Sequence, residues 1–402
     1  MDWQTPEDAV PSTFVTEADQ RALLGKPPAT GAWQEGDPSG ARRFIDIGTV
    51  PLEAGGEVPT ARIAYETFGT PNADSSNAVL VLHALTGDAH LTGPAGPGQP
   101  TAGWWSGIVG PGLAIDTDHW YVVAPNILGG CQGSTGPASV APDLREWGSR
   151  FPELTIRDQV EAQRRFADAI GIERWAAVIG GSMGGMHVLE WAITHPQRVA
   201  KVAILAAPAV ASADQIALNS VQTEAIGMDP RFRGGNYYGL PDGEGPHRGL
   251  ALARRMALLN YRSPHELNAR FARSWQSGLD PLTTKSARYA VESYLDFHGN
   301  KFTRRFDANS YLRLVGAMSS HDIGRGRESV EVALSRIEMP ALILGIDSDR
   351  LFPVADQKFI ALHVPGNLDG TDPVVISSEY GHDGFLIENE LVGRELGRLL
   401  DA

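Results

Sequence analysis

A serine crowded by glycines lies near the middle of the chain. Gly180, Ser182 and Gly184 fit the pattern G-x-S-x-G, directly after the apolar run WAAVI and before the amphipathic segment GGMHVLEWAITHP. Between a strand and a helix, such a serine takes a strained backbone conformation, and its neighbours must be small because the two elements approach closely. The helix N-terminus then directs free N–H groups toward negative charge that develops beside the serine. The pattern predicts a nucleophilic Ser182.

The same glycine-rich stretch could also be a simple turn, a phosphate-binding loop or a dinucleotide-binding loop. A glycine-rich turn that only reverses the chain is the simplest alternative. A phosphate-binding loop does not fit, because no Lys-Ser or Lys-Thr pair follows, and the glycine spacing differs from that of a dinucleotide-binding fingerprint. The position between a predicted strand and a predicted helix favours the nucleophile over the simple turn.

A nucleophilic serine needs a histidine base and a carboxylate that orients it. On a doubly wound sheet these follow the serine in the order acid, histidine, each beyond the C-terminal end of a strand. After PALILGI, Asp349 is predicted over Asp347 because it lies further beyond the strand end. After the last predicted strand, His382 lies on a glycine-containing loop, whereas His363 falls in a helix-like segment. The predicted catalytic residues are Ser182, Asp349 and His382.

The tetrahedral intermediate of acyl transfer needs two N–H donors for its oxyanion. The backbone amides of Leu85, in the loop after the apolar run VLVL, and of Met183 are predicted to supply them. His83 and His90 lie seven residues apart, which raises the question of a metal site. No third ligand accompanies them, so we expect structural roles for both and no bound metal.

Short apolar runs predict the strands that must position these residues. RRFIDIGTV and PTARIAYETFG are expected to form a hairpin, since Gly55 and Gly56 lie between them. Continuous apolar runs separated by helical patterns indicate parallel strands that are covered on both faces. The predicted fold class is therefore α/β, with a mostly parallel central sheet and helices on both faces. The further predicted strands lie in NAVLVLHAL, WYVVAPN, WAAVIGG, VAKVAILAAP, PALILGID and PVVISSE.

Composition changes along the chain predict its division into parts. Residues 1–41 are polar, rich in Pro, Gly and Asp, and predicted to form a partly disordered extension. Residues 42–209 and 336–402 carry the strand-like runs and are predicted to form the two parts of one core. Between them, residues 210–335 contain helical patterns such as GLALARRMALLNYR, SPHELNARFARSWQ and KSARYAVESYLDFHG. We expect this insertion to form a lid over the C-terminal edge of the sheet.

Overall composition excludes several classes of protein. Of 402 residues, 42% are hydrophobic and 20% charged, and the formal net charge of -14 argues against sequence-independent binding to nucleic acid or to an anionic membrane. The longest apolar stretch, VAKVAILAAPAVASA, is too short to span a bilayer, and the N-terminus lacks the pattern of a signal peptide. Cys131 is the one cysteine, which excludes an intramolecular disulfide and a zinc site built from several thiolates. A cytoplasmic location is expected.

Further motifs carry a resemblance to a known family. HALTGDAH, NILGGCQGSTGP, GGSMGGMHVLEW, ARRMALLNYRSPHELNARF, KFTRRFDANSYL, SHDIGRG, DSDRLFP and YGHDGFL occur in this order. Together they make residues 42–400 resemble homoserine O-acetyltransferases, which are α/β-hydrolase-fold enzymes of methionine biosynthesis. The stretches GCQGSTGP and RFDANSY are more specific than the serine motif, which many esterases share.

The resemblance implies a two-step acetyl transfer, with acetyl-CoA as co-substrate and no tightly bound cofactor. Ser182 would accept the acetyl group and pass it to the γ-hydroxyl of L-homoserine. The resemblance also implies that Arg254 binds the carboxylate and Asp383 the ammonium of the amino acid, in keeping with the bidentate grip of arginine on carboxylates. Arg255 is the alternative to Arg254, and a helix N-cap the alternative role for Asp383. Because lids of this family often pair, a homodimer through the lid is implied.

The predicted fold and catalytic triad are compatible with several other activities. Succinyl-CoA as donor would make a homoserine O-succinyltransferase, L-serine as acceptor a serine O-acetyltransferase, and water as acceptor a serine esterase. A simple esterase has no need of the pair Arg254 and Asp383, and a scaffold without catalysis has no need of the triad. For the entrance of the polyanionic CoA, the cations of KFTRRF and GRGR are candidates, and Tyr261, Tyr294 and Tyr311 are candidates to line the tunnel.

Overall fold

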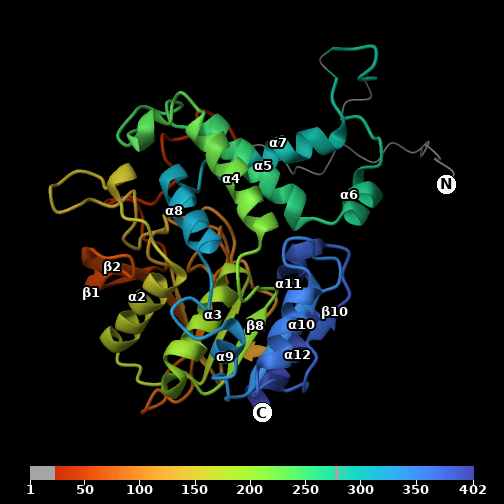
Figure 1. Ribbon diagram of the computed structural model, residues 1–402. Coiled ribbons are helices and arrows are strands. Elements are labelled where there is room, and N and C mark those ends of the chain that lie inside the picture. The colour runs from red at the N-terminus through yellow and green to blue at the C-terminus, as the bar shows by residue number, and fades with distance from the viewer. Residues whose placement is uncertain (1–22, 277–279, 286) are drawn as a thin grey trace.

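The computed structural model describes residues 23–276, 280–285 and 287–402 (Figure 1). Within them, one eight-stranded sheet has the strand order β1-β2-β6-β3-β7-β8-β9-β10. The hairpin of β1 (Arg43–Pro51) and β2 (Glu57–Phe68) is antiparallel and joins the sheet antiparallel to β6, and all other neighbours are parallel. These are the strands that the apolar runs predict. The parallel strands are β3 (Ala78–Leu82), β6 (Tyr121–Pro125), β7 (Ala177–Gly181), β8 (Val202–Leu205), β9 (Ala341–Ile346) and β10 (Val374–Ile376).

Alternate residues of the central strands enter two separate hydrophobic cores, one on each face of the sheet. In β8, Val202 and Ile204 belong to one core, while Ala203 and Leu205 belong to the other. Every residue of β3, β7, β8 and β9 is buried. Burial on both faces explains why these strands are continuously apolar rather than alternating.

Helices cover both faces of the sheet (Figure 1). Helices α2 (Ile156–Ala169), α3 (Met183–Thr194) and α10 (Val354–His363) contribute to one core, and α12 (Asn389–Asp401) to the other. The short pair β4 (Val109–Gly110) and β5 (Ile115–Asp116) lies beside α12. The remaining short elements of the core are η1 (Gly148–Arg150), η2 (Pro196–Arg198), η4 (Gly381–Asp383) and α11 (Gly384–Ile387).

The lid (residues 210–335) is helical and lies between β8 and β9 in the chain. Figure 1 shows its helices α4 to α8 gathered at one end of the sheet, with α4 packed against α5 and α8, and α5 against α7. Two helices are shorter than the patterns that predict them. The first ends at Phe271, because Ala272 adopts a φ of 42°, and the second begins only at Ala290. The lid elements are α4 (Ala213–Gly227), η3 (Arg233–Gly235), α5 (His247–Tyr261), α6 (Pro264–Phe271), α7 (Ala290–Phe302), α8 (Ala308–Ser319) and α9 (Val330–Leu334).

The predicted N-terminal extension falls partly outside the described residues, which begin at residue 23. Its described part contacts both the core and the lid. The amide of Trp33 donates to the carbonyl of Cys131 at 2.9 Å, and the hydroxyl of Thr30 donates to Asp307, directly before α8, at 2.8 Å. Residues 23–41 therefore connect the core with the lid.

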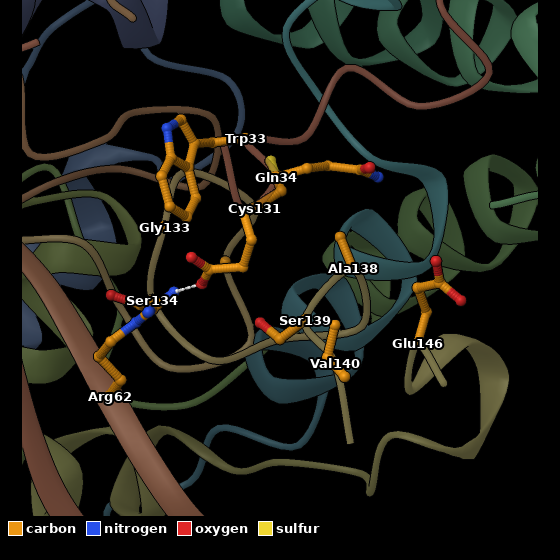
Figure 2. A pocket seen from close by; sticks show the side chains of 12 residues that line it. Trp33, Gln34, Arg62, Cys131, Gly133, Ser134, Ala138, Ser139, Val140 and Glu146 are labelled. Atoms are coloured by element: carbon orange, nitrogen blue, oxygen red, sulfur yellow. Dashed lines mark hydrogen bonds and ion pairs between the residues drawn. The ribbon is translucent and has the colours of Figure 1, made fainter. Parts of the chain in front are cut away.

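Figure 2 shows a pocket of about 150 Å³ between this segment and the loop that carries GCQGSTGP. Glu35 and Arg62, which form an ion pair, both line it. Its one thiol is that of Cys131, whose pKa burial raises to about 12, so the sulfur stays protonated and a poor nucleophile. This pocket does not include Ser182.

Candidate active site

Ser182 lies at a sharp turn between β7 and α3. Its φ of 58° and ψ of -124° are strained for a residue with a β-carbon. A β-carbon on Gly180 would lie 2.5 Å from the carbonyl group of Gly184, and one on Gly184 would lie 2.2 Å from the carbonyl oxygen of Leu82. Neither position has room for a side chain. The glycines of the motif thus allow β7, α3 and β3 to approach closely around the serine.

The structure brings Ser182, His382 and Asp349 together, although 200 residues separate the serine from the histidine. The Nε2 atom of His382 lies 2.9 Å from the Oγ atom of Ser182. The Nδ1 atom of His382 lies 2.6 Å from Oδ2 of Asp349. The other carboxylate oxygen of Asp349 accepts hydrogen bonds from the amides of Leu351 and Phe352, at 2.8 and 3.0 Å. The carboxylate is held in place, and it orients the imidazole toward the hydroxyl.

The alternative acid and base lie elsewhere. Asp347 accepts hydrogen bonds from the hydroxyl of Ser377 at 2.7 Å and from the amide of Ser378 at 3.0 Å. His363 is on α10, where its Nδ1 atom donates to the carbonyl of Phe359 at 2.8 Å. Neither residue lines the pocket of Ser182.

His382 is buried among aromatic rings. The rings of Phe352 and Phe385 lie 5.2 and 5.5 Å from the imidazole, measured between ring centroids. Burial lowers the pKa of His382, but the charge and hydrogen bond of Asp349 outweigh it and raise that pKa above its ordinary value. The imidazole is therefore well suited to accept a proton from Ser182.

The predicted oxyanion donors belong to two segments near the serine. Leu85 lines the same pocket as Ser182, and Met183 is the first residue of α3. Among the described residues, neither of the two amides donates a hydrogen bond to a protein acceptor. Both N–H groups are thus available to a ligand.

The two histidines of the preceding loop have structural contacts. His83 uses Nδ1 to donate to the carbonyl of Ala84 at 2.8 Å and Nε2 to accept from the amide of Ile127 at 3.3 Å. His90 pairs with Glu66 at 3.0 Å. Across the part of the chain that the structure describes, no cluster of three or more His, Cys, Asp or Glu side chains is placed to hold a metal ion.

A pocket of about 220 Å³ opens above the serine and contains both predicted substrate-binding residues. The guanidinium of Arg254 lies over the rings of Tyr261 and Phe302, 5.5 and 5.2 Å from their centroids. Arg255 instead forms an ion pair with Asp296 at 2.9 Å and does not line this pocket. Of the two neighbouring arginines, the geometry favours Arg254. The lining residues are Ala84, Leu85, Thr86, Ser182, Arg254, Tyr261, Arg262, His382, Asp383, Phe385, Leu386 and Ile387.

A second cation lines the pocket, and sequence reasoning missed it. The Nε atom of Arg262 lies 3.2 Å from Oδ2 of Asp383. Burial raises the pKa of Asp383, and the positive charge of Arg262 opposes that rise. Asp383 precedes α11, but its side chain makes no capping hydrogen bond, so the N-cap alternative is not realised. Arg262 follows directly after the last residue of α5 and has an extended backbone, so helical spacing from Arg254 does not indicate it.

The cations suggested for the CoA entrance have other partners. Arg304 donates to the carbonyl oxygens of residues 23 and 25, and Arg305 to that of Thr86. Arg325 pairs with Glu53 at 2.8 Å, and Arg327 with Glu190 at 2.7 Å. These arginines tie segments of the protein together, and none of them lines the pocket of Ser182.

Of the three tyrosines suggested to line the tunnel, one lines the pocket of Ser182 and two do not. Tyr261 lines the pocket, with its ring 5.8 Å from that of His382, whereas Tyr294 and Tyr311 are buried outside it. The hydroxyl of Tyr311 donates to Gln222 within the lid. Only Tyr261 of the three is placed to touch a ligand above Ser182.

Comparisons with known proteins match this architecture. A family model described as alpha/beta hydrolase fold matches residues 77–387. The chain is 70% identical over 388 residues to a homoserine O-acetyltransferase of Clavibacter michiganensis subsp. michiganensis, covering 96% of this chain and 100% of that protein. A homoserine O-acetyltransferase of Leifsonia xyli subsp. xyli is 63% identical over 403 residues, covering 100% of both chains.

A solved structure is similar as well. The crystal structure of homoserine O-acetyltransferase from Bacillus anthracis aligns with a TM-score of 0.79 at 27% identity, covering 90% of this chain and 97% of that one. In the described part of the chain, no helix combines the length and the apolar character needed to cross a membrane.

Proposed function

Because the chain belongs to the homoserine O-acetyltransferase family of α/β-hydrolase-fold acyltransferases, we propose that it transfers an acetyl group from acetyl-CoA to the γ-hydroxyl of L-homoserine. The products are O-acetyl-L-homoserine and CoA, in methionine biosynthesis. The observation that carries the proposed mechanism is the unbroken contact from Asp349 through His382 to the hydroxyl of Ser182, at 2.6 and 2.9 Å.

In the first half-reaction, Oγ of Ser182 attacks the thioester carbonyl carbon while Nε2 of His382 takes the hydroxyl proton. The amides of Leu85 and Met183 stabilise the oxyanion of the tetrahedral intermediate. The intermediate collapses by breaking the carbon–sulfur bond, and the imidazolium gives its proton to the departing thiolate. Free CoA leaves, and the acetyl group remains on Ser182.

In the second half-reaction, Nε2 of His382 takes the proton of the γ-hydroxyl of homoserine as that oxygen attacks the acetyl carbon. The same two amides stabilise the second oxyanion. Collapse breaks the bond to the serine oxygen, and His382 returns the proton to Ser182. The enzyme is restored with no net gain or loss of protons.

The charges of the pocket suit a zwitterionic acceptor. Arg254 and Arg262 offer cations for the carboxylate, and Asp383 offers an anion for the ammonium group. A neutral ester carries no carboxylate or ammonium group for these charges, so the pocket suits homoserine better than a simple ester. The ammonium group of the bound substrate would then contact the carboxylate of Asp383, which contacts Arg262 in the free enzyme.

An assay of CoA release tests the proposed function. The protein is given acetyl-CoA or succinyl-CoA, each with L-homoserine, L-serine or no acceptor. We expect release with acetyl-CoA and homoserine to exceed every other combination. Equal release without an acceptor would support an esterase, and preference for succinyl-CoA or serine would identify a different transferase.

We further propose a cytoplasmic homodimer that forms through the lid. Exposed apolar side chains on α4, on α5 and at the residue that directly follows α4 support this arrangement. Met228 and Leu252 are 74% and 42% exposed and line one shared hollow of the lid surface. Val221 and Leu259, each seven residues from one of them, are also exposed, so each helix segment presents an apolar stripe.

A further inference from the structure

Three of the specific sequence motifs meet at one arginine outside the catalytic residues. Arg305 belongs to KFTRRFDANSYL, Gln132 to GCQGSTGP, and Thr86 to HALTGDAH. The arginine lies in the lid, between the end of α7 and the start of α8. The reaction steps above use none of its atoms.

The side chain of Arg305 grips the oxyanion loop, which comprises residues 83–88. Its Nη1 and Nη2 atoms each donate to the carbonyl oxygen of Thr86 at 2.9 Å. Nη2 also lies 3.2 Å from the carboxylate of Asp88. The side chains of Arg305 and Asp88 are only 15% and 6% exposed, so water screens this contact little.

The gripped carbonyl belongs to the turn that presents the oxyanion donor. The amide of Gly87 donates to the carbonyl of Ala84 at 2.9 Å, which closes a four-residue turn around Leu85 and Thr86. His83 donates to the same carbonyl of Ala84 and holds the entry of the turn. Arg305 holds its exit, one residue beyond Leu85. The direction of the Leu85 N–H is therefore fixed from both sides.

The backbone of Arg305 is itself held by the core. The Nε2 atom of Gln132 donates to the carbonyl oxygen of Arg305 at 2.6 Å. The amide oxygen of Gln132 accepts a hydrogen bond from Arg42 at 2.8 Å. Both ends of the arginine, backbone and guanidinium, thus contact the core. This places a lid residue in a fixed position beside the oxyanion loop.

We propose that Arg305 is a positioning residue that holds the Leu85 amide in the geometry needed to stabilise the oxyanion. The proposal rests on the proposed function only in taking Leu85 as an oxyanion donor. Because one oxyanion hole serves both tetrahedral intermediates, loss of the grip should slow every acyl transfer from an acetyl donor, whatever the acceptor. Loss of a homoserine-binding residue would slow only the transfer to homoserine.

The test compares Arg305→Ala and Arg305→Lys with Arg304→Ala as a matched control. Arg304 is the preceding residue, and its guanidinium contacts the carbonyls of residues 23 and 25 instead. Three rates are measured: acetylation of Ser182 by acetyl-CoA, transfer to homoserine, and hydrolysis of p-nitrophenyl acetate. Thermal unfolding of each variant is recorded alongside. Lysine keeps a positive charge for Asp88 but cannot donate from two nitrogens to Thr86.

We expect Arg305→Ala to lower all three rates by about 10- to 100-fold, since a displaced donor forfeits much of its stabilisation of the transition state. Arg305→Lys should lose less, and Arg304→Ala should stay within about twofold of the unchanged protein. Gln132→Ala should add no further loss to Arg305→Ala, because Gln132 holds the backbone of Arg305 and affects the oxyanion loop by positioning the guanidinium that the first change removes.

Two outcomes would overturn the proposal. One is a lower unfolding temperature of both Arg305 variants with all three rates preserved, which would indicate a purely structural contact. The other is loss of homoserine transfer alone, with ester hydrolysis intact. If the unchanged protein failed to take an acetyl group from acetyl-CoA, the proposed function would fail instead, and ester hydrolysis would still test Arg305.

Discussion

Ser182, His382 and Asp349 depend on one another for their chemistry. The hydroxyl is a weak nucleophile until the imidazole takes its proton, and the imidazole points at the hydroxyl because Asp349 holds its other nitrogen. The carboxylate also raises the pKa of His382 against the effect of burial. The charge of Asp349 therefore controls both the orientation and the basicity of the base.

Replacing Asp349 by Asn should lower kcat by about 10⁴-fold, because the imidazole loses its orienting carboxylate. The acid limb of the pH profile of kcat/KM should also move to lower pH. Asp349 raises the pKa of His382, so removing its charge lets the histidine lose its proton at lower pH. Asp347→Asn is the matched control and should retain most activity. An unshifted acid limb in Asp349→Asn would count against His382 as the titrating base.

Arg254→Ala should raise the KM for homoserine by about 10- to 100-fold, the usual loss for a hydrogen bond to a charged group. Hydrolysis of p-nitrophenyl acetate should change little, because that ester carries no carboxylate. Arg255→Ala provides the comparison, since this arginine pairs with Asp296 outside the pocket. Equal effects of the two substitutions on the homoserine KM would contradict the assigned role of Arg254.

The order of serine, acid and histidine along the chain predicted Ser182, Asp349 and His382, and the fold brings these three residues together. Arg262 was not predicted, because its role depends on how closely the end of α5 approaches Asp383 in the folded chain. The partners of the arginines proposed for the CoA entrance were not predicted for a similar reason. Sequence shows a cluster of charges in KFTRRF, but not that a backbone carbonyl lies within reach of each guanidinium.

At the scale of elements, the sharp turn between β7 and α3 is the feature on which the site depends most. Strand and helix approach so closely that Gly180 and Gly184 touch, and Gly184 also touches the end of β3. Close contact there sets the strained backbone of Ser182 and lifts its hydroxyl into the pocket. Catalytic geometry and packing are thus coupled at this turn.

Gly184→Ala should lower the free energy of unfolding by about 1–3 kcal/mol, the usual range for overpacking. Its β-carbon would lie 2.2 Å from a backbone oxygen that cannot move independently of β3. Activity should fall further than stability suggests, because Ser182 would shift. Gly397→Ala in α12 is the control: nothing lies within 4 Å of its β-carbon, so this change should stabilise by about 0.5–1 kcal/mol. Urea unfolding measures both, and equal changes would contradict the packing explanation.

The central strands were predictable because a strand that is buried on both faces needs a continuous run of apolar residues. Each apolar run that predicted a strand does contain a strand in the structure. Helix ends in the lid were less predictable. The segment after Phe271 retains a helical pattern, but Ala272 turns the chain and Trp275 pairs with Tyr289 instead. Such long-range pairing decides local structure without a local sequence pattern.

For the whole molecule, the lid links three parts of the chain. It supplies Arg254 to the pocket and Arg305 to the oxyanion loop, and Asp307 contacts the N-terminal segment through Thr30. Its outer surface carries the exposed apolar residues of α4 and α5. One side of the lid thus contributes to the proposed site, and the proposed dimer contact lies on its outer surface.

Light scattering should give a molar mass near twice the 43.1 kDa of one chain. The double change Met228→Asp and Leu252→Asp should convert the protein to monomers, because charges would enter the apolar contact. Leu362→Asp on α10 is the control, since this exposed leucine lies outside the lid. A monomeric unchanged protein, or a dimer that survives the double change, would refute pairing through this surface.

Covalent capture of the acetyl group tests the central mechanism most directly. Intact protein is mixed with acetyl-CoA without homoserine, and mass spectrometry locates any added acetyl group. We predict one acetyl group on the peptide that contains Ser182, its loss on addition of homoserine, and none in Ser182→Ala. An acetyl group that persists in the Ser182→Ala pocket, or transfer to homoserine at an undiminished rate in that variant, would contradict an acetyl-serine intermediate.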